Sequence, residues 1–268
     1  YSGSDYVMFS DTLSMYPVQD SEKWFEIPVV ATNICDYDRS FGVEVDDKAS
    51  NAIEKKQYVV ESNTVTIKAG ERVAKFRMKG VYENIGKTDS LSVTFNLLAK
   101  DENIWDLYGT RTRVQMQKAC PFELSTFEGY CLLTSSFFSA YMTNTEHRLL
   151  QAERDKAEDN TIILHDFFYK NYDLKIKYDP SDPLKPFVEF DEQIIGSTAE
   201  AFGTIYGNGK LMCDQPVAYD SYYNVCQKFV ILYTTIYVVG KGTVGTYVNI
   251  LEWISDEEAE QYKKEEGL

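Results

Sequence analysis

The chain has 268 residues, of which 27 are basic and 42 acidic, so its formal net charge is −15. Binding to nucleic acid or to an anionic membrane surface needs clustered Lys and Arg, and this balance argues against both as partners. Apolar residues make up 44% of the chain, which is enough for a sizeable core and excludes wholesale disorder. The length suits one large β domain or two of ordinary size.

Strand patterns dominate the first 118 residues. Polar and apolar residues alternate around Val65 and Ile67, and the turn Ala69–Glu71 leads into a second alternating run. A period of two is typical of strands with one buried face, as in a two-sheet sandwich. We therefore predict an immunoglobulin-like β-sandwich of about seven strands. The clearest expected strands are Trp24–Val30, Phe41–Val45, Thr64–Lys68, Val73–Lys79 and Leu91–Leu98.

A second all-β unit, a sandwich or a barrel, is expected after the break at Cys120-Pro121. The charge also shifts there, because residues 1–118 carry a net charge of −3 and residues 119–268 carry −12. We therefore predict two domains, 1–118 and 119–268. The expected strands of the second are Tyr130–Phe138, His147–Glu153, Thr161–Phe168, Asp173–Tyr178, Phe187–Phe190, Ala201–Tyr206, Val225–Val239 and Gly245–Ile254.

One short helix is expected at the end of the chain, over Ala259–Glu266. Ser255 is its N-cap, and Glu258, three residues later, completes a capping box. The longest apolar run, Phe229–Val239, is too short to span a membrane as a helix, so we interpret it as a buried strand.

Five cysteines show no C-x-x-C spacing, so a zinc site is not expected. No cofactor is expected either. Cys120 could bridge to Cys131, and Cys213 to Cys226, each at the base of a hairpin. Small buried free thiols are the favoured alternative.

The segment from Tyr58 to Met78, which includes Thr-Val-Thr-Ile-Lys-Ala-Gly-Glu, and the later run Leu91–Leu98 resemble the Calx-beta family. The resemblance covers residues 40–100 and implies a β-sandwich. Family members that bind calcium hold it with several carboxylates in loops at one end of the sandwich. Here the stretch Lys87–Ser90 supplies one carboxylate, so we expect no tight calcium site in residues 1–118.

The overall plan is similar to two-domain surface lipoproteins of Bacteroidetes bacteria. Phe127-Glu128-Gly129-Tyr130 stands where the second domain of those proteins opens, and Tyr1–Asp5 resembles their polar tether. The resemblance implies an exported protein at the bacterial outer membrane and cell surface. It also implies an N-terminal lipid anchor, whose cysteine would lie upstream of this chain, as the only contact with the membrane.

Acidic pairs such as Asp46-Asp47, Asp36 with Asp38 and Asp191-Glu192 raise the alternative of a hydrolase acting on polysaccharide. Glycoside hydrolysis needs two carboxyl groups with unlike pKa values facing each other across a cleft. Adjacent acidic residues usually mark solvated turns, so no catalytic residue is assigned and the protein is not expected to be an enzyme.

The aromatic segment after Pro216 gives the candidate site, which we expect in a loop. Tyrosine rings on a polar loop can stack on sugars or anchor an interface, while Asp and Asn side chains supply hydrogen bonds. We predict adhesion or ligand binding, with a neutral glycan or another surface protein as partner. A purely structural spacer is a third possibility. The predicted ligand-binding residues are Tyr219, Asp220, Tyr222, Tyr223 and Asn224.

Overall fold

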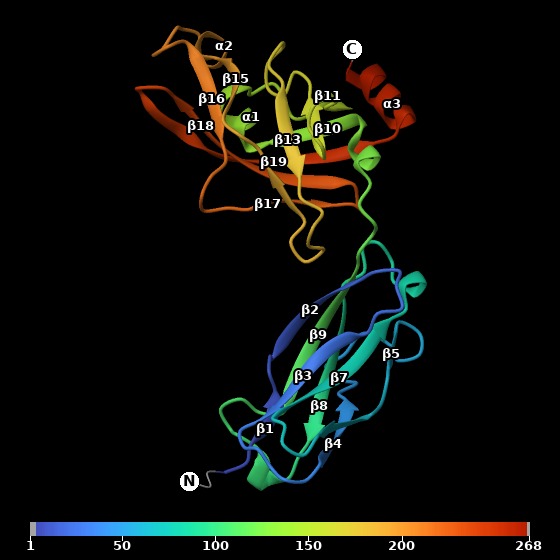
Figure 1. The fold of residues 1–268 in the computed structure, drawn as a ribbon. Coiled ribbons are helices and arrows are strands. Elements are labelled where there is room, and N and C mark those ends of the chain that lie inside the picture. The colour runs from blue at the N-terminus through green and yellow to red at the C-terminus, as the bar shows by residue number, and fades with distance from the viewer. Residues whose placement is uncertain (1–3, 267–268) are drawn as a thin grey trace. The chain divides into compact units, whose positions relative to one another are not determined.

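The computed structural model describes residues 4–266 and is almost entirely β, as the sequence predicts (Figure 1). It contains two compact units, unit 1 (Tyr1–Cys120) and unit 2 (Pro121–Leu268), and each is described by itself. Among the described residues, no helix is both long enough and apolar enough to cross a membrane.

Unit 1 is a sandwich of two sheets, which confirms the predicted fold class. All its strand pairs are antiparallel except β2 with β9, which run parallel. One sheet has the order β1 (Val7–Phe9), β3 (Phe25–Ala31), β7 (Val73–Gly80), β5 (Tyr58–Val60). The other has the order β2 (Leu13–Val18), β9 (Arg111–Lys118), β8 (Leu91–Leu98), β4 (Arg39–Val45), β6 (Thr64–Ile67). Two short 3₁₀ helices, η1 (Tyr82–Asn84) and η2 (Asp101–Asn103), lie in its loops.

The core of unit 1 follows the period-two pattern. Val65 and Ile67 of β6 are buried, as the alternation predicts. From the facing sheet, Phe76 of β7 meets Phe95 of β8 edge to face, with ring centroids 4.9 Å apart. All five strands expected here are present to within two residues. The described residues of this unit hold nine strands rather than about seven, because short strands such as β1 and β5 have weak patterns.

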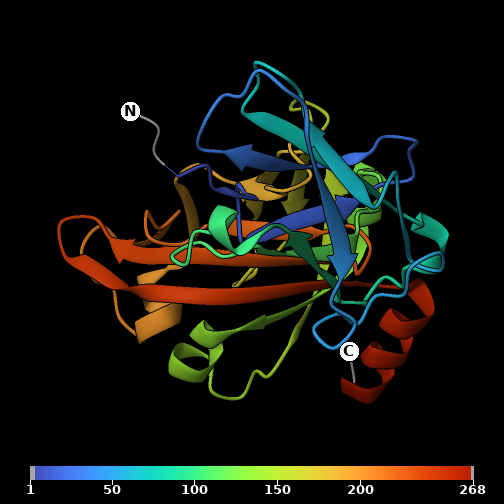
Figure 2. The same cartoon turned by 90° about the horizontal axis from the view of Figure 1, so that it is seen from below.

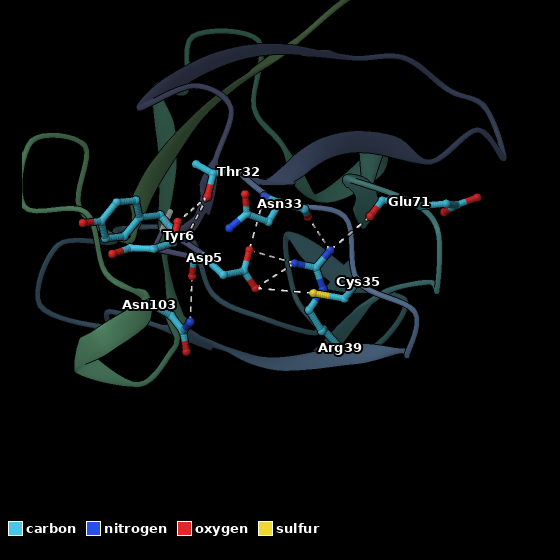
Figure 3. A network of polar contacts seen from close by, with 9 residues as sticks. Asp5, Tyr6, Thr32, Asn33, Cys35, Arg39, Glu71 and Asn103 are labelled. Atoms are coloured by element: carbon cyan, nitrogen blue, oxygen red, sulfur yellow. Dashed lines mark hydrogen bonds and ion pairs between the residues drawn. The ribbon is translucent and has the colours of Figure 1, made fainter. Parts of the chain in front are cut away.

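A part-buried ion pair between Arg39 and Asp5 ties the beginning of the chain to the sandwich (Figure 3). Arg39 donates from Nη1 to both carboxylate oxygens of Asp5, at 3.0 and 2.9 Å. Its Nη2 donates to the backbone oxygens of Asn33 and Glu71, at 3.1 and 3.0 Å. Asn103 donates to the Asp5 carbonyl at 2.7 Å. One guanidinium thus joins three separate segments, and charge-assisted hydrogen bonds of this kind are strong.

Unit 2 contains a barrel of eight antiparallel strands, and consecutive strands of the chain are neighbours except that β15 and β16 intervene between β14 and β17. The ring closes because β19 pairs with β10 on one side and with β18 on the other. In order, the strands are β10 (Gly129–Ser135), β11 (Arg148–Arg154), β12 (Thr161–Leu164), β13 (Leu174–Tyr178), β14 (Phe187–Glu189), β17 (Ser221–Asn224), β18 (Phe229–Val238) and β19 (Gly242–Ile254).

A hairpin of β15 (Gln193–Ser197) and β16 (Lys210–Asp214) extends this barrel. Strand β18 is long enough to pair with β17 along its first half and with β16 along its second. An eight-stranded barrel has an interior that side chains can fill. Here it holds a buried aromatic core, in which the Phe127 ring stacks on Tyr178 at 4.6 Å and meets Trp253 at 5.0 Å.

The expected strand Tyr130–Phe138 is correct only as far as Ser135. There β10 ends, and the short helix α1 (Ser136–Tyr141) begins. The Ser135 hydroxyl accepts a hydrogen bond from the backbone N–H of Phe137 at 3.1 Å, which is an N-cap contact. Because Ser135 caps a helix within this apolar run, the chain is helical after Ser135 and does not continue as the expected strand.

The expected strand Ala201–Tyr206 is wrong. Its first residues end the helix α2 (Thr198–Phe202), which begins with a capping box between Ser197 and Glu200. Gly203, with a φ of 72°, ends this helix in the left-handed conformation that glycine accepts most readily. The other expected strands of unit 2 overlap observed ones, and the C-terminal helix α3 (Asp256–Glu266) is confirmed.

Candidate functional site

The residues predicted as a site, Tyr219, Asp220, Tyr222, Tyr223 and Asn224, do not share one environment. The loop we expected is a strand from residue 221 onward, namely β17. The expected strand Val225–Val239 begins only at Phe229 because the four residues before it form a turn. That turn needs a left-handed residue, Lys228 with a φ of 55°. Alternation along β17 then sends neighbouring side chains to opposite faces.

Tyr223 points into the barrel and is only 5% exposed. Its ring lies 5.2 Å from Tyr178 and 5.8 Å from Phe127, and its hydroxyl donates to the Asp179 carbonyl at 3.2 Å. Burial, with the charge of Asp179 as a smaller cause, raises the pKa of Tyr223 to about 12. This tyrosine is a core residue and is not available to a ligand, so its place in the predicted set is not supported.

Tyr222 and Tyr219 lie on the outer face of the barrel, 40% and 53% exposed. The Tyr219 ring stacks on Tyr233 of β18, with centroids 5.1 Å apart and planes at 21°. The Ser221 hydroxyl accepts a hydrogen bond from the Tyr233 N–H at 2.9 Å, which holds the preceding loop against β18.

The two polar residues of the predicted set have different surroundings. Asp220 is exposed next to Tyr219. The Asn224 side chain accepts a hydrogen bond from the Gln227 N–H at 2.9 Å and thereby stabilises the turn between β17 and β18. Asn224 therefore has a structural contact of its own, whereas Asp220 can reach a ligand beside Tyr219.

Two further tyrosines extend this outer face. Along β18 the residues Val230, Leu232, Thr234, Ile236 and Val238 are buried, and the residues between them face outward. The outward set includes Tyr233, Thr235 and Tyr237. We call the group Tyr219, Tyr222, Tyr233, Thr235 and Tyr237 the outer tyrosine strip. The sequence interpretation took the whole run as buried and therefore missed Tyr233 and Tyr237. The aromatic and Thr residues at every second position of the run indicate the outward face.

The strip stands on a rigid support, because β18 lies beside β19 over its full length (Figure 2). Beneath it, buried Asn249 donates to the Thr234 hydroxyl at 3.0 Å and to the Leu232 carbonyl at 2.9 Å. Ser135 of β10 donates to the Asn249 side-chain oxygen at 2.6 Å. A satisfied buried polar network fixes the relative positions of the strands that it joins.

Carboxylates border the strip. Asp214 of β16 is the pairing partner of Thr235, and directly opposed residues project from the same face of a sheet. Glu192 accepts a hydrogen bond from the Tyr237 hydroxyl. This bond is the largest cause that raises the pKa of Tyr237 to about 12, and the charge of Asp214 contributes to the same shift. The Thr235 and Thr246 hydroxyls lie 3.1 Å apart on this face.

A cavity of about 470 Å³ is lined by residues of β13, β14 and β15, and β13 and β15 are not paired with each other. The Gln193 side chain bridges the gap, because it accepts from the Lys175 N–H and donates to the Lys175 carbonyl, both at 2.9 Å. Lys175 also forms an ion pair with Asp155 at 2.5 Å, and the hydrogen bond from Lys175 is the largest cause that lowers the pKa of that carboxyl. The cavity is lined mainly by polar residues, among them Glu158, Glu189, Asp191 and Gln215.

Of the acidic residues named from the sequence, Asp191 lines this cavity and Glu192 borders the strip, whereas Asp38 and Asp46 are held in ion pairs. Asp38 forms an ion pair with Lys68 at 2.8 Å, and its pKa is lowered chiefly by that hydrogen bond. Asp46 pairs with Arg111 at 2.6 Å. Among residues 4–266, no three His, Cys, Asp or Glu side chains gather in a way that could hold a metal ion.

The two cysteine bridges considered from the sequence do not form. Cys131 and Cys213 are free thiols in the barrel core. Burial raises the pKa of both thiols, which keeps them protonated and unreactive. The alternative of buried free thiols is therefore confirmed for these two residues.

Comparison with solved structures gives distant similarities. The Calx CBD1 domain is 16% identical with a TM-score of 0.35, and the match covers 43% of this chain and 98% of that one. A protein of unknown function from Bacteroides ovatus is 10% identical with a TM-score of 0.38, covering 91% and 90%. An auxiliary nutrient binding protein from Bacteroides thetaiotaomicron is 10% identical with a TM-score of 0.33, covering 90% and 91%.

Comparison of sequences gives one family. No curated protein matches the chain. The family model described as a domain of unknown function (DUF4984) matches residues 107–265, which include nearly all of unit 2 and more than half of the chain. The chain therefore belongs to the DUF4984 family.

Proposed function

We propose that the protein is a non-enzymatic binding module that binds an extended glycan through the outer tyrosine strip of unit 2. The observation that carries the proposal is the arrangement along β18. Tyr233 and Tyr237 face outward from one strand, Thr235 lies between them, and the Tyr219 ring is stacked beside Tyr233. Residues two apart on a strand are about 6.6 Å apart, so the two rings are separated by about 13 Å along the strand.

Such a strip suits a chain of sugars. Tyrosine combines an apolar ring face with a hydrogen-bonding hydroxyl, which matches the mixed apolar and polar surface of a sugar ring. The Thr235 and Thr246 hydroxyls and the Asp220 carboxylate supply hydrogen-bond partners beside the rings. Because the rings stand on paired strands, little conformational entropy is lost when a ligand binds.

A surface protein as partner is the second form of the same proposal, since exposed tyrosines also anchor protein interfaces. The glycan is favoured because the rings are aligned along one strand, as a linear ligand requires. The alternative of a polysaccharide hydrolase needs a carboxylic acid whose pKa is raised, beside a second carboxylate. Hydrogen bonds lower the pKa of two carboxyl groups of unit 2, Asp155 and Asp179, which excludes these two as that acid.

We also propose that the protein is exported and held at the bacterial outer surface by a lipid attached upstream of residue 1. This rests on the resemblance to Bacteroidetes surface lipoproteins. Protease treatment of intact cells that express the full-length protein tests it, because a surface-exposed unit 2 is degraded while an internal one is protected.

Binding to an array of neutral, amino and acidic oligosaccharides tests the function, followed by calorimetric titration of the best ligand. Tyr219→Ala combined with Tyr233→Ala should weaken binding by about thirtyfold to several hundredfold, because each anchoring ring contributes roughly 1–2 kcal/mol. Tyr37→Ala, which removes an exposed tyrosine of unit 1, is the matched control and should leave affinity unchanged. Absence of any glycan ligand, or a folded double variant that binds like wild type, would refute the proposal.

A further inference from the structure

Two carboxylates, Asp214 and Glu192, lie beside the outer tyrosine strip. Within the part of the chain that the structure describes, neither Asp214 nor Glu192 forms an ion pair with Lys or Arg. Other carboxylates of unit 2 do, for example Asp155 with Lys175 at 2.5 Å and Glu128 with Arg154 at 2.6 Å. The strip therefore carries negative charge that the protein does not neutralise locally.

Both carboxylates lie near one tyrosine. Glu192 accepts the Tyr237 hydroxyl, and the charge of Asp214 also acts on Tyr237. Because Asp214 is paired with Thr235, it projects from the sheet between the positions of Tyr233 and Tyr237. The face of an aromatic ring attracts cations, and the attraction adds to that of neighbouring carboxylates.

A metal ion does not suit this place. Calcium needs six to eight oxygen ligands. The described residues contain no group of three metal-ligating side chains here or elsewhere. A positive charge on an organic group suits it better, because rings, hydroxyls and carboxylates can each contact a different part of such a ligand.

We propose that the glycan bound by the strip carries protonated amino groups, as in oligomers of a hexosamine with free amines. This inference rests on the proposed function and names its ligand class. A sugar ring would stack on Tyr233 or Tyr237, while its ammonium group would lie beside Asp214 and Glu192. Acidic polysaccharides would be repelled by the same two carboxylates and by the net charge of −12 on residues 119–268.

Oligomers of equal length that differ only in charge provide the test. Calorimetry would use the complete chain with glucosamine oligomers, N-acetylglucosamine oligomers and galacturonic acid oligomers, at about pH 6, where the free amine is protonated. Glucosamine oligomers should bind about tenfold more tightly than their acetylated counterparts, as two partly exposed ion pairs allow. That preference should shrink between about 0.05 M and 0.5 M salt, and galacturonic acid oligomers should bind most weakly.

Substitutions test whether Asp214 and Glu192 cause the preference for free-amine oligomers. In Asp214→Asn combined with Glu192→Gln, the ratio of the two affinities should fall to about one, because both replacements keep hydrogen bonding and remove the charge. Glu257→Gln, a charge loss on α3, is the matched control and should keep the preference.

The outcomes distinguish failure of the amino-glycan inference from failure of the glycan proposal. If acetylated and free-amine oligomers bind equally well through the tyrosines, the amino-glycan inference is overturned and the glycan proposal stands. If the double carboxylate variant keeps its preference, the inference is also wrong. If no oligomer binds and the array is empty, the glycan proposal fails as well.

Discussion

Adjacent tyrosines on β17 should respond in opposite ways to truncation. Tyr223→Ala removes a buried ring that contacts Phe122, Phe127 and Tyr178 at centroid distances of 5.5, 5.8 and 5.2 Å. Truncating a buried aromatic side chain costs about 3–5 kcal/mol of stability. Tyr222→Ala removes a ring that is 40% exposed, so its cost should stay below about 1 kcal/mol.

Urea denaturation followed by circular dichroism measures the difference. At about 2–4 °C per kcal/mol for a domain of this size, Tyr223→Ala should also lower the melting temperature by roughly 6–20 °C. Tyr223→Phe separates packing from hydrogen bonding and should cost only about 0.5–1.5 kcal/mol. Equal destabilisation by the two alanine substitutions, or a larger loss from Tyr222→Ala, would refute the inward and outward assignment on which the outer tyrosine strip depends.

Four further predictions concern pH, the ion pair of unit 1, domain independence and calcium. Because the pKa of Tyr223 is raised from 10.0 to about 12 in the fold, its contribution to stability is complete below pH 10 and is lost as the pH rises to about 12. Urea midpoints between pH 9 and pH 12 should therefore fall less steeply in Tyr223→Phe than in wild type, and parallel curves would contradict this. Arg39→Met should destabilise unit 1 by roughly 2–4 kcal/mol, because it leaves the Asp5 carboxylate without its partner. Adding Asp5→Asn should restore part of the lost stability. Strict additivity of the two effects in the double-mutant cycle would argue against coupling between the two side chains. We expect residues 119–268 to fold alone with a cooperative transition, and calcium to leave the melting temperature of residues 1–118 unchanged; a molten fragment or a calcium-dependent increase would count against these two expectations.

Local alternation made much of the fold predictable, because strands such as β6 and β8 each carry their own pattern. Closure of the barrel was not predictable in the same way, since the pairing of β10 with β19 joins residues more than a hundred positions apart. The short helices α1 and α2 were missed because single capping residues, Ser135 and Ser197, decide them within otherwise strand-like runs.

The candidate site was found only in part for a related reason. Tyr219 and Tyr222 were recognised as exposed, but Tyr223 was grouped with them because the segment was expected to be a loop, where neighbouring residues can share one side. The turn before Phe229 depends on Lys228 in a left-handed conformation. That position holds neither glycine nor asparagine, the residues that would have predicted such a turn. Once that turn is placed, alternation assigns Tyr223 to the core and Tyr233 and Tyr237 to the surface.

The polar network of Ser135, Asn249 and Thr234 has a consequence for the outer face of β18. A shift of one residue in the pairing of β18 would exchange its two faces and bury the tyrosines. The network penalises such a slip, because displaced partners would leave buried polar groups without hydrogen bonds. With the register fixed by the inward residues, the outward positions of β18 are free to change. The outer face of β18 can therefore be substituted without redesigning the barrel.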